Sequence, residues 1–180
     1  MKKIITDKTR SFIPSALTNK KTLILGLGNE ILTDDGIGPK LVRDLAQMIN
    51  SQNIHFNSAF CGGLEIVEFI KDYEQVIFID AIHTRGGRPG DVYYFIPSDF
   101  RETSHLSSLH DVSFLTALKL GNILNMGLPD DLHIIAIEII EDMEFGNELT
   151  PQLKERYSQI LEEVIILVKK ILRKERIAVY

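Results

Sequence analysis

The chain has 180 residues and a formal net charge of −5, and 44% of its residues are hydrophobic, so one domain with a sizeable buried core is expected. The negative charge argues against a broad nucleic-acid interface, because phosphate binding requires a surplus of Lys and Arg. Cys61 is the only cysteine, which excludes an intramolecular disulfide and a multi-cysteine zinc site and fits a reducing cytoplasm.

Residues 1–21 are basic but lack the apolar run of about 7 to 15 residues that an export signal requires. Elsewhere no segment reaches the roughly 20 uninterrupted apolar residues of a membrane helix. We therefore expect a cytoplasmic protein without membrane or nucleic-acid partners. Its predicted parts are a basic N-terminal extension over 1–21 and a single α/β domain over 22–180.

Short apolar runs alternate with helical patterns along the first half of this domain. Residues 22–27 (TLILGL) predict a buried parallel strand. Apolar residues at helical spacing predict a helix over 36–49. The segments that follow are predicted as a strand, a short helix and two further strands, over residues 54–59, 64–70, 75–81 and 91–96.

The second half continues the alternation. A helix is predicted over residues 110–124 and a strand over 133–140. Thr150 and Pro151 then supply the N-cap and first-turn residues of a long helix. Strands that alternate with helices require parallel crossovers, so the predicted fold is a three-layer α/β sandwich with a mostly parallel sheet of about five strands.

A glycine-rich loop over residues 26–38 (GLGNEILTDDGIG) follows the first strand. It is not a nucleotide site, because Ile31 stands where the dinucleotide motif needs its third glycine and no phosphate-binding Lys is present. Glu30, Asp34 and Asp35 would repel a phosphate and attract a metal ion or a cationic group.

A second acidic residue, Asp80, follows the apolar run 76–79 of a later strand. Ligands of open α/β sheets bind beyond the carboxyl ends of the strands, so Asp35 and Asp80 would converge if their strands are neighbours. Two carboxylates suit a hard cation, whereas an added imidazole favours nickel, zinc or iron. His110, at the start of the helix predicted over residues 110–124, is our candidate for that imidazole.

Each candidate also has a purely structural interpretation. Asp34 or Asp35 could cap the following helix, and Asp80 could bind neighbouring backbone N–H groups. His110 could be a surface or capping histidine. The chain contains neither a G-x-S-x-G elbow nor an H-E-x-x-H helix, so the sequence does not support a serine hydrolase or a zincin.

The 23–38 segment, LILGLGNEILTDDGIG, has an opening strand, a G-x-G-N turn, a four-residue spacer, an acidic pair and a closing glycine. With Ile79-Asp80-Ala81, Ser108-Leu109-His110 and Glu148-Leu149-Thr150-Pro151, it resembles the [NiFe]-hydrogenase maturation endopeptidases over about residues 22–155. These proteases remove a C-terminal extension from the nickel-loaded large-subunit precursor.

The resemblance implies roles for three residues. Asp35, Asp80 and His110 would bind the precursor's nickel, and Asp35 and Asp80 would be the catalytic residues of an aspartic-type endopeptidase. Nickel would arrive as cargo of the large-subunit precursor, which is the expected partner. His105 lies close enough in the sequence to compete with His110 as the third ligand.

Two alternative functions remain open at this point. A signalling receiver domain also carries an acidic pair after its first strand and would be phosphorylated on aspartate. In receivers, however, the pair directly ends the strand, whereas residues 28–33 intervene here. A non-enzymatic nickel-binding maturation chaperone is compatible with the same residue types.

Overall fold

The computed structural model describes residues 18–60, 65–99, 109–174 and 177, and for 109–115 the backbone only. Within these residues a five-stranded sheet has the order β2-β1-β3-β5-β4. Four strands are parallel: β1 (Thr22–Leu27), β2 (Ile54–Ala59), β3 (Gln75–Ile82) and β5 (Asp131–Glu138). The edge strand β4 (Val92–Phe95) runs antiparallel to β5.

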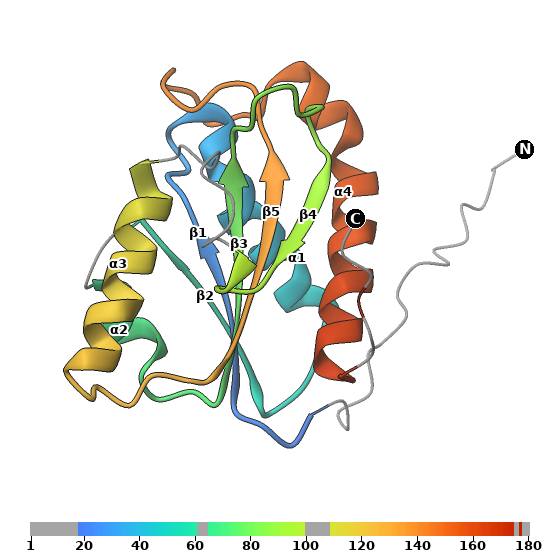
Figure 1. Ribbon diagram of the computed structural model, residues 1–180. Helices are drawn as coiled ribbons and strands as arrows, with labels where there is room; N and C mark the ends of the chain where they lie inside the picture. The colour runs from blue at the N-terminus through green and yellow to red at the C-terminus, as the bar shows by residue number, and fades with distance from the viewer. Residues whose placement is uncertain (1–17, 61–64, 100–108, 175–176, 178–180) are drawn as a thin grey trace, which may run out of the picture.

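Helices cover both faces of the sheet (Figure 1). One face packs against α1 (Ile37–Met48) and α4 (Pro151–Leu172), and the other against α2 (Glu65–Ile70) and α3 (Leu109–Ile123). A 3-10 turn, η1 (Thr33–Gly36), precedes α1. The predicted three-layer α/β sandwich is therefore confirmed. No helix among the described residues has both the length and the apolar content needed to span a bilayer.

The central strands are apolar on both faces because both faces are covered by helices. In β1, Ile24 packs into the core of α1 and α4, whereas Leu23 and Leu25 pack toward α2 and α3. In β3, Ile77 and Ile79 alternate with Val76 and Phe78 in the same way. This alternation determines the face on which the next side chain, Asp80, lies.

Some predicted boundaries are wrong by a few residues. The third strand extends to Ile82, so Asp80 lies inside the strand rather than at its end. The last strand spans Asp131–Glu138 instead of 133–140, because half-buried polar residues begin it. Helix α1 begins after Gly36, and neither Asp34 nor Asp35 caps it, since its N-cap position has no side-chain hydrogen bond.

Candidate active site

The candidate site lies at the carboxyl edge of the sheet, where the strand order reverses. Strand β2 pairs with one side of β1, and β3 pairs with the other side. The direction in which successive strands are placed therefore reverses at β1, and the carboxyl ends of β1 and β3 lie on either side of this topological switch point. Ligands of open α/β sheets bind at such points. The segment after β1 forms η1, which contacts β3. The two predicted acidic segments are therefore neighbours.

Glycines allow this segment to pack closely on the sheet. A Cβ on Gly38 would lie 2.4 Å from the backbone carbonyl oxygens of Leu27 and Ile79. A Cβ on Gly26 would lie 2.8 Å from the backbone of Gly38. The first turn of α1 thus rests directly on β1 and β3, which only glycine permits at both positions.

Gly28 completes the turn. It has a φ of +129°, and a Cβ there would lie 2.0 Å from the backbone oxygen of Asp35. Asp35 is 7% exposed, and its Oδ2 accepts a hydrogen bond of 2.5 Å from the backbone N–H of Asn29. The glycine spacing therefore holds the Asp35 carboxylate against the end of β1.

The other member of the acidic pair, Asp34, ties two loops together. It is fully buried, and its Oδ1 accepts a hydrogen bond of 2.7 Å from the backbone N–H of Thr150. Its Oδ2 accepts bonds from the Thr150 hydroxyl at 3.0 Å and from the backbone N–H groups of Ile140 and Glu141 at 3.3 and 3.2 Å. Both oxygens of Asp34 are thus engaged in holding the β5–α4 loop.

Thr150 occupies the predicted N-cap position of α4, with Pro151 in the first turn. Its side chain makes no capping hydrogen bond to α4, because the hydroxyl donates to Asp34 instead. The predicted helix start is therefore correct, although the threonine side chain serves a tertiary contact.

Asp80 is half-buried in β3, on the neighbouring strand. It follows the alternation that turns Val76 and Phe78 toward α2 and α3. Its Oδ1 accepts a 2.8 Å hydrogen bond from the backbone N–H of Ala81, so part of the structural interpretation of Asp80 is correct. The carboxylate lies on the face that α3 covers.

His110 is the second residue of α3, on that same face. Its side chain lies outside the described part of the structure, as do His105 and Cys61. Among the described residues, no three His, Cys, Asp or Glu side chains are grouped so that they could hold a metal ion. Since the predicted set requires the His110 side chain, Asp35, Asp80 and His110 remain a prediction.

Sequence analysis did not identify Glu138, a third carboxylate buried at this edge beside Asp34 and Asp35. It is 1% exposed at the end of β5, and its two oxygens accept 2.7 Å hydrogen bonds from the backbone N–H and the hydroxyl of Thr84. A Cβ on Gly87 would lie 2.2 Å from this carboxylate. Glu138 thus orders the β3–β4 loop. The signal was an acidic residue inside the apolar run HIIAIEII.

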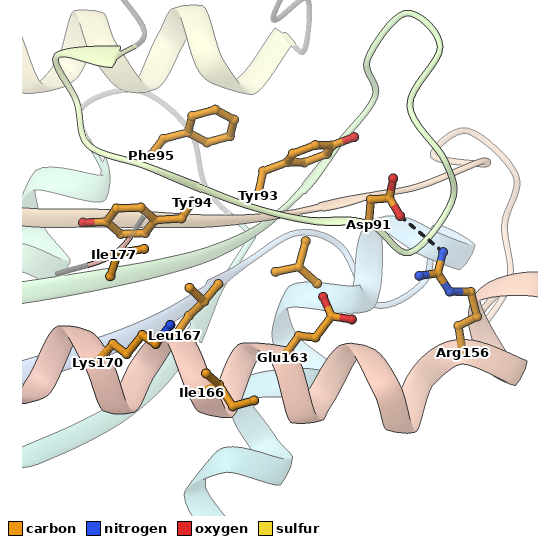
Figure 2. Close-up of a pocket in the computed structure, with 11 residues that line it drawn as sticks. Asp91, Tyr93, Tyr94, Phe95, Arg156, Glu163, Ile166, Leu167, Lys170 and Ile177 are labelled. Atoms are coloured by element: carbon orange, nitrogen blue, oxygen red, sulfur yellow. Dashed lines mark ion pairs between the residues drawn. The ribbon is translucent and has the colours of Figure 1, made fainter. Parts of the chain in front are cut away.

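A groove of about 550 Å³ lies between β4 and α4 (Figure 2). Its apolar lining includes Val92, Tyr94 and Leu167, and an ion pair of 3.5 Å between Arg156 and Asp91 stands at one end. None of the predicted ligands lines this groove. It is therefore separate from the candidate active site.

A chain of polar side chains lies at the opposite edge of the sheet. The Tyr94 hydroxyl lies 2.8 Å from Nδ1 of His133, whose Nε2 lies 2.7 Å from Oδ1 of Asp131. Lys20 and Gln75 bind the other oxygen of Asp131. Burial lowers the pKa of His133, although the Asp131 carboxylate opposes this shift.

Comparisons with known proteins agree with this architecture. A family model described as hydrogenase maturation protease matches residues 39–166. The chain is 27% identical over 150 residues to the hydrogenase expression/formation protein HupD of Thiocapsa roseopersicina, covering 81% of this chain and 66% of that protein. It is also 27% identical to the hydrogenase 2 maturation protease of Escherichia coli K12, over 83% of this chain and 91% of the relative.

Solved structures of hydrogenase maturation proteases also match this chain. The [NiFe] hydrogenase maturation protease HybD from Thermococcus kodakarensis superposes with a TM-score of 0.63 at 28% identity, over 82% of this chain and 98% of that one. The maturating endopeptidase HybD from E. coli has the same fold, with a TM-score of 0.68 at 23% identity, over 83% of this chain and 93% of that one. These matches do not support the receiver or chaperone alternatives.

Proposed function

The chain belongs to the hydrogenase maturation protease family, and from that membership we propose that it removes the C-terminal extension of a nickel-loaded [NiFe]-hydrogenase large-subunit precursor. The observation that carries this proposal is the position of Asp35, buried at the switch point between β1 and β3 beside the strand that holds Asp80. Open α/β sheets place ligands at this point.

Asp35, Asp80 and His110 would bind the precursor's nickel. Two carboxylates and one imidazole leave coordination positions of a nickel ion open, so the precursor's own ligands would complete the shell. Asp34 uses both oxygens to hold the β5–α4 loop, so Asp34 is not a candidate ligand. Asp35 is the member of the acidic pair to which the resemblance assigns the metal.

The chemical step is hydrolysis of a peptide bond. A carboxylate of Asp35 or Asp80 would act as the general base that takes a proton from the attacking water, and would pass that proton to the leaving amine as the peptide bond breaks. This role corresponds to an aspartic-type endopeptidase. The single cysteine fits action in the reducing cytoplasm.

Shared coordination would also make cleavage depend on nickel insertion. Metal held jointly by enzyme and substrate adds binding energy only when the precursor is loaded, so the enzyme would discriminate between two states of one substrate. Free nickel would bind the enzyme weakly, because three protein ligands form an incomplete shell.

The test presents purified nickel-loaded and nickel-free precursor separately to the enzyme, with chelator in the nickel-free sample, and follows the mass of the large subunit. We expect the C-terminal extension to be lost from the loaded precursor only. Equal cleavage of both samples would show that the protease recognises the peptide extension alone. Failure to shorten either precursor would refute the proposed function.

A further inference from the structure

Three large apolar side chains are exposed at the carboxyl edge of the sheet. Ile31, Met143 and Phe145 are 52%, 79% and 83% exposed. Single exposed apolar residues are common, but a group of them marks an interaction surface. Phe60, directly after β2 on the same edge, is 64% exposed as well. We call the group formed by Ile31, Met143 and Phe145 the apolar rim.

The apolar rim is built from two segments more than a hundred residues apart in the sequence. The backbone N–H of Gly146 donates to Ile31 at 3.0 Å, and that of Thr33 donates to Gly146 at 2.9 Å. The Thr33 hydroxyl donates to the backbone oxygen of Glu144 at 2.6 Å. Figure 1 shows the orange loop after β5 beside the blue segment after β1. These bonds hold the rim in a defined conformation.

The loop that carries Met143 and Phe145 is acidic. Glu141 binds the backbone N–H groups of Met143 and Glu144 at 2.7 and 2.9 Å, so its carboxylate shapes the loop itself. Asp142 and Glu144 add negative charge on either side of Met143, and Glu144 is exposed. A complementary partner would present apolar side chains together with Lys or Arg.

The rim adjoins the candidate active site through the acidic pair. The residue before Asp35 is Asp34, whose carboxylate binds the backbone at Glu141, where the acidic loop begins. A protein whose scissile peptide reaches Asp35 would therefore lie across Ile31 and Phe145.

We propose that the apolar rim is the docking surface for an apolar and basic segment of the hydrogenase large-subunit precursor. This inference rests on the proposed function, since it names the part of the protease that holds the same substrate. The rim lies outside the set of nickel ligands, so it contributes affinity for loaded and unloaded precursor alike. Such uniform binding lowers KM and leaves kcat unchanged.

The test compares wild type with Phe145→Ser and Met143→Ser in binding to immobilised nickel-free precursor and in cleavage of the loaded form. Removal of an aromatic anchor from an interface typically weakens binding about tenfold or more. We expect that increase in Kd and a comparable rise in KM for Phe145→Ser, with kcat unchanged. The 83% exposure of Phe145 means that its removal leaves the core intact, which urea unfolding verifies.

Matched controls come from the same chain. Ile123 is the last residue of α3 and is 74% exposed. Figure 1 shows that α3 ends away from the carboxyl edge of the sheet, so Ile123→Ser should bind as wild type does. For charge, Glu144→Lys should weaken binding in a salt-dependent way, whereas Glu162→Lys on α4 should not.

The outcomes separate the two proposals. Equal binding by wild type and Phe145→Ser, including no detectable binding by either, would overturn the docking surface. A wild-type protein that binds the precursor through the rim but fails to shorten the loaded form would overturn the proposed function and leave the docking surface standing.

Discussion

The Asp34 carboxylate accepts two hydrogen bonds from Thr150, one from its backbone N–H at 2.7 Å and one from its hydroxyl at 3.0 Å. These residues are 116 positions apart in the chain. The contact joins η1, which carries Asp35, to the start of α4. In the acidic pair, the first residue therefore anchors the loop that presents the second.

This contact predicts that Asp34→Asn destabilises the protein. An asparagine amide would place N–H donors where Asp34 now accepts four hydrogen bonds, and unsatisfied buried donors cost about 1–3 kcal/mol each. We expect the free energy of unfolding to fall by about 2 kcal/mol or more, measured by urea denaturation. Unchanged stability would contradict the anchoring role of Asp34.

Asp35→Asn should reduce activity and leave stability unchanged. The asparagine oxygen can still accept the bond from the Asn29 N–H, so the fold should survive, but the anionic ligand is lost. We expect the variant to process almost none of the loaded precursor, as measured by mass spectrometry. Its midpoint of urea unfolding should equal that of the wild type. A normal cleavage rate would remove Asp35 from the proposed nickel site.

The third nickel ligand can be identified by comparing two histidine variants. His110→Ala should weaken metal binding and processing, because His110 lies in α3 on the face that Asp80 shares. His105→Ala should have a mild effect. Rates measured side by side on one precursor preparation decide between them, and the reverse ranking would transfer the role to His105.

Gly38→Ala tests the close contact between α1 and the sheet. Alanine is usually better than glycine inside a helix by about 1 kcal/mol, yet here its Cβ would lie 2.4 Å from two backbone oxygens. We expect a net loss of about 1–3 kcal/mol in unfolding free energy and lower activity, because η1 must shift. Gly121→Ala in α3 is the control, since its nearest neighbour, at 2.7 Å, is the flexible Leu128 side chain. An equal loss for both would contradict this argument.

The fold was predictable where a sequence pattern reports burial directly. The apolar runs of β1 and β3 and the glycine spacing at Gly26, Gly28 and Gly38 predicted the parallel strands and the loop at their edge. The position of Asp35 at the switch point followed from the same reasoning.

Other features depend on contacts that no local pattern reports. The role of Asp34 requires a partner more than a hundred residues away, and Glu138 is buried because Thr84 satisfies both of its oxygens. The early start of β5 was missed because its first residue, Asp131, is charged, and its pairing with His133 is not visible in the sequence. The assignment of His110 as a ligand stays a prediction.

The polar side chains Tyr94, His133 and Asp131, at the edge of the sheet opposite the candidate active site, give a testable dependence of stability on pH. Asp131 can only accept a hydrogen bond when ionised, so Nε2 of neutral His133 donates to it and Nδ1 accepts from the Tyr94 hydroxyl. Burial holds the pKa of His133 below its ordinary value of 6.5, and the Lys20 ammonium acts in the same direction, while Asp131 opposes both.

Just below pH 6.5, His133 therefore binds more protons in the unfolded chain than in the folded chain. This contribution to stability is fully present above 6.5 and is lost as the pH falls toward the lower folded-state pKa of His133. The test is to measure the free energy of urea unfolding above and below pH 6.5. We expect the wild type to lose stability on the acid side, and His133→Gln to lose less, because glutamine cannot titrate. Tyr94→Phe is the control, since it removes the hydroxyl and keeps the imidazole, so the pH dependence should persist. Identical pH profiles for wild type and His133→Gln would show that His133 does not control acid stability, and would transfer that role to the carboxylates.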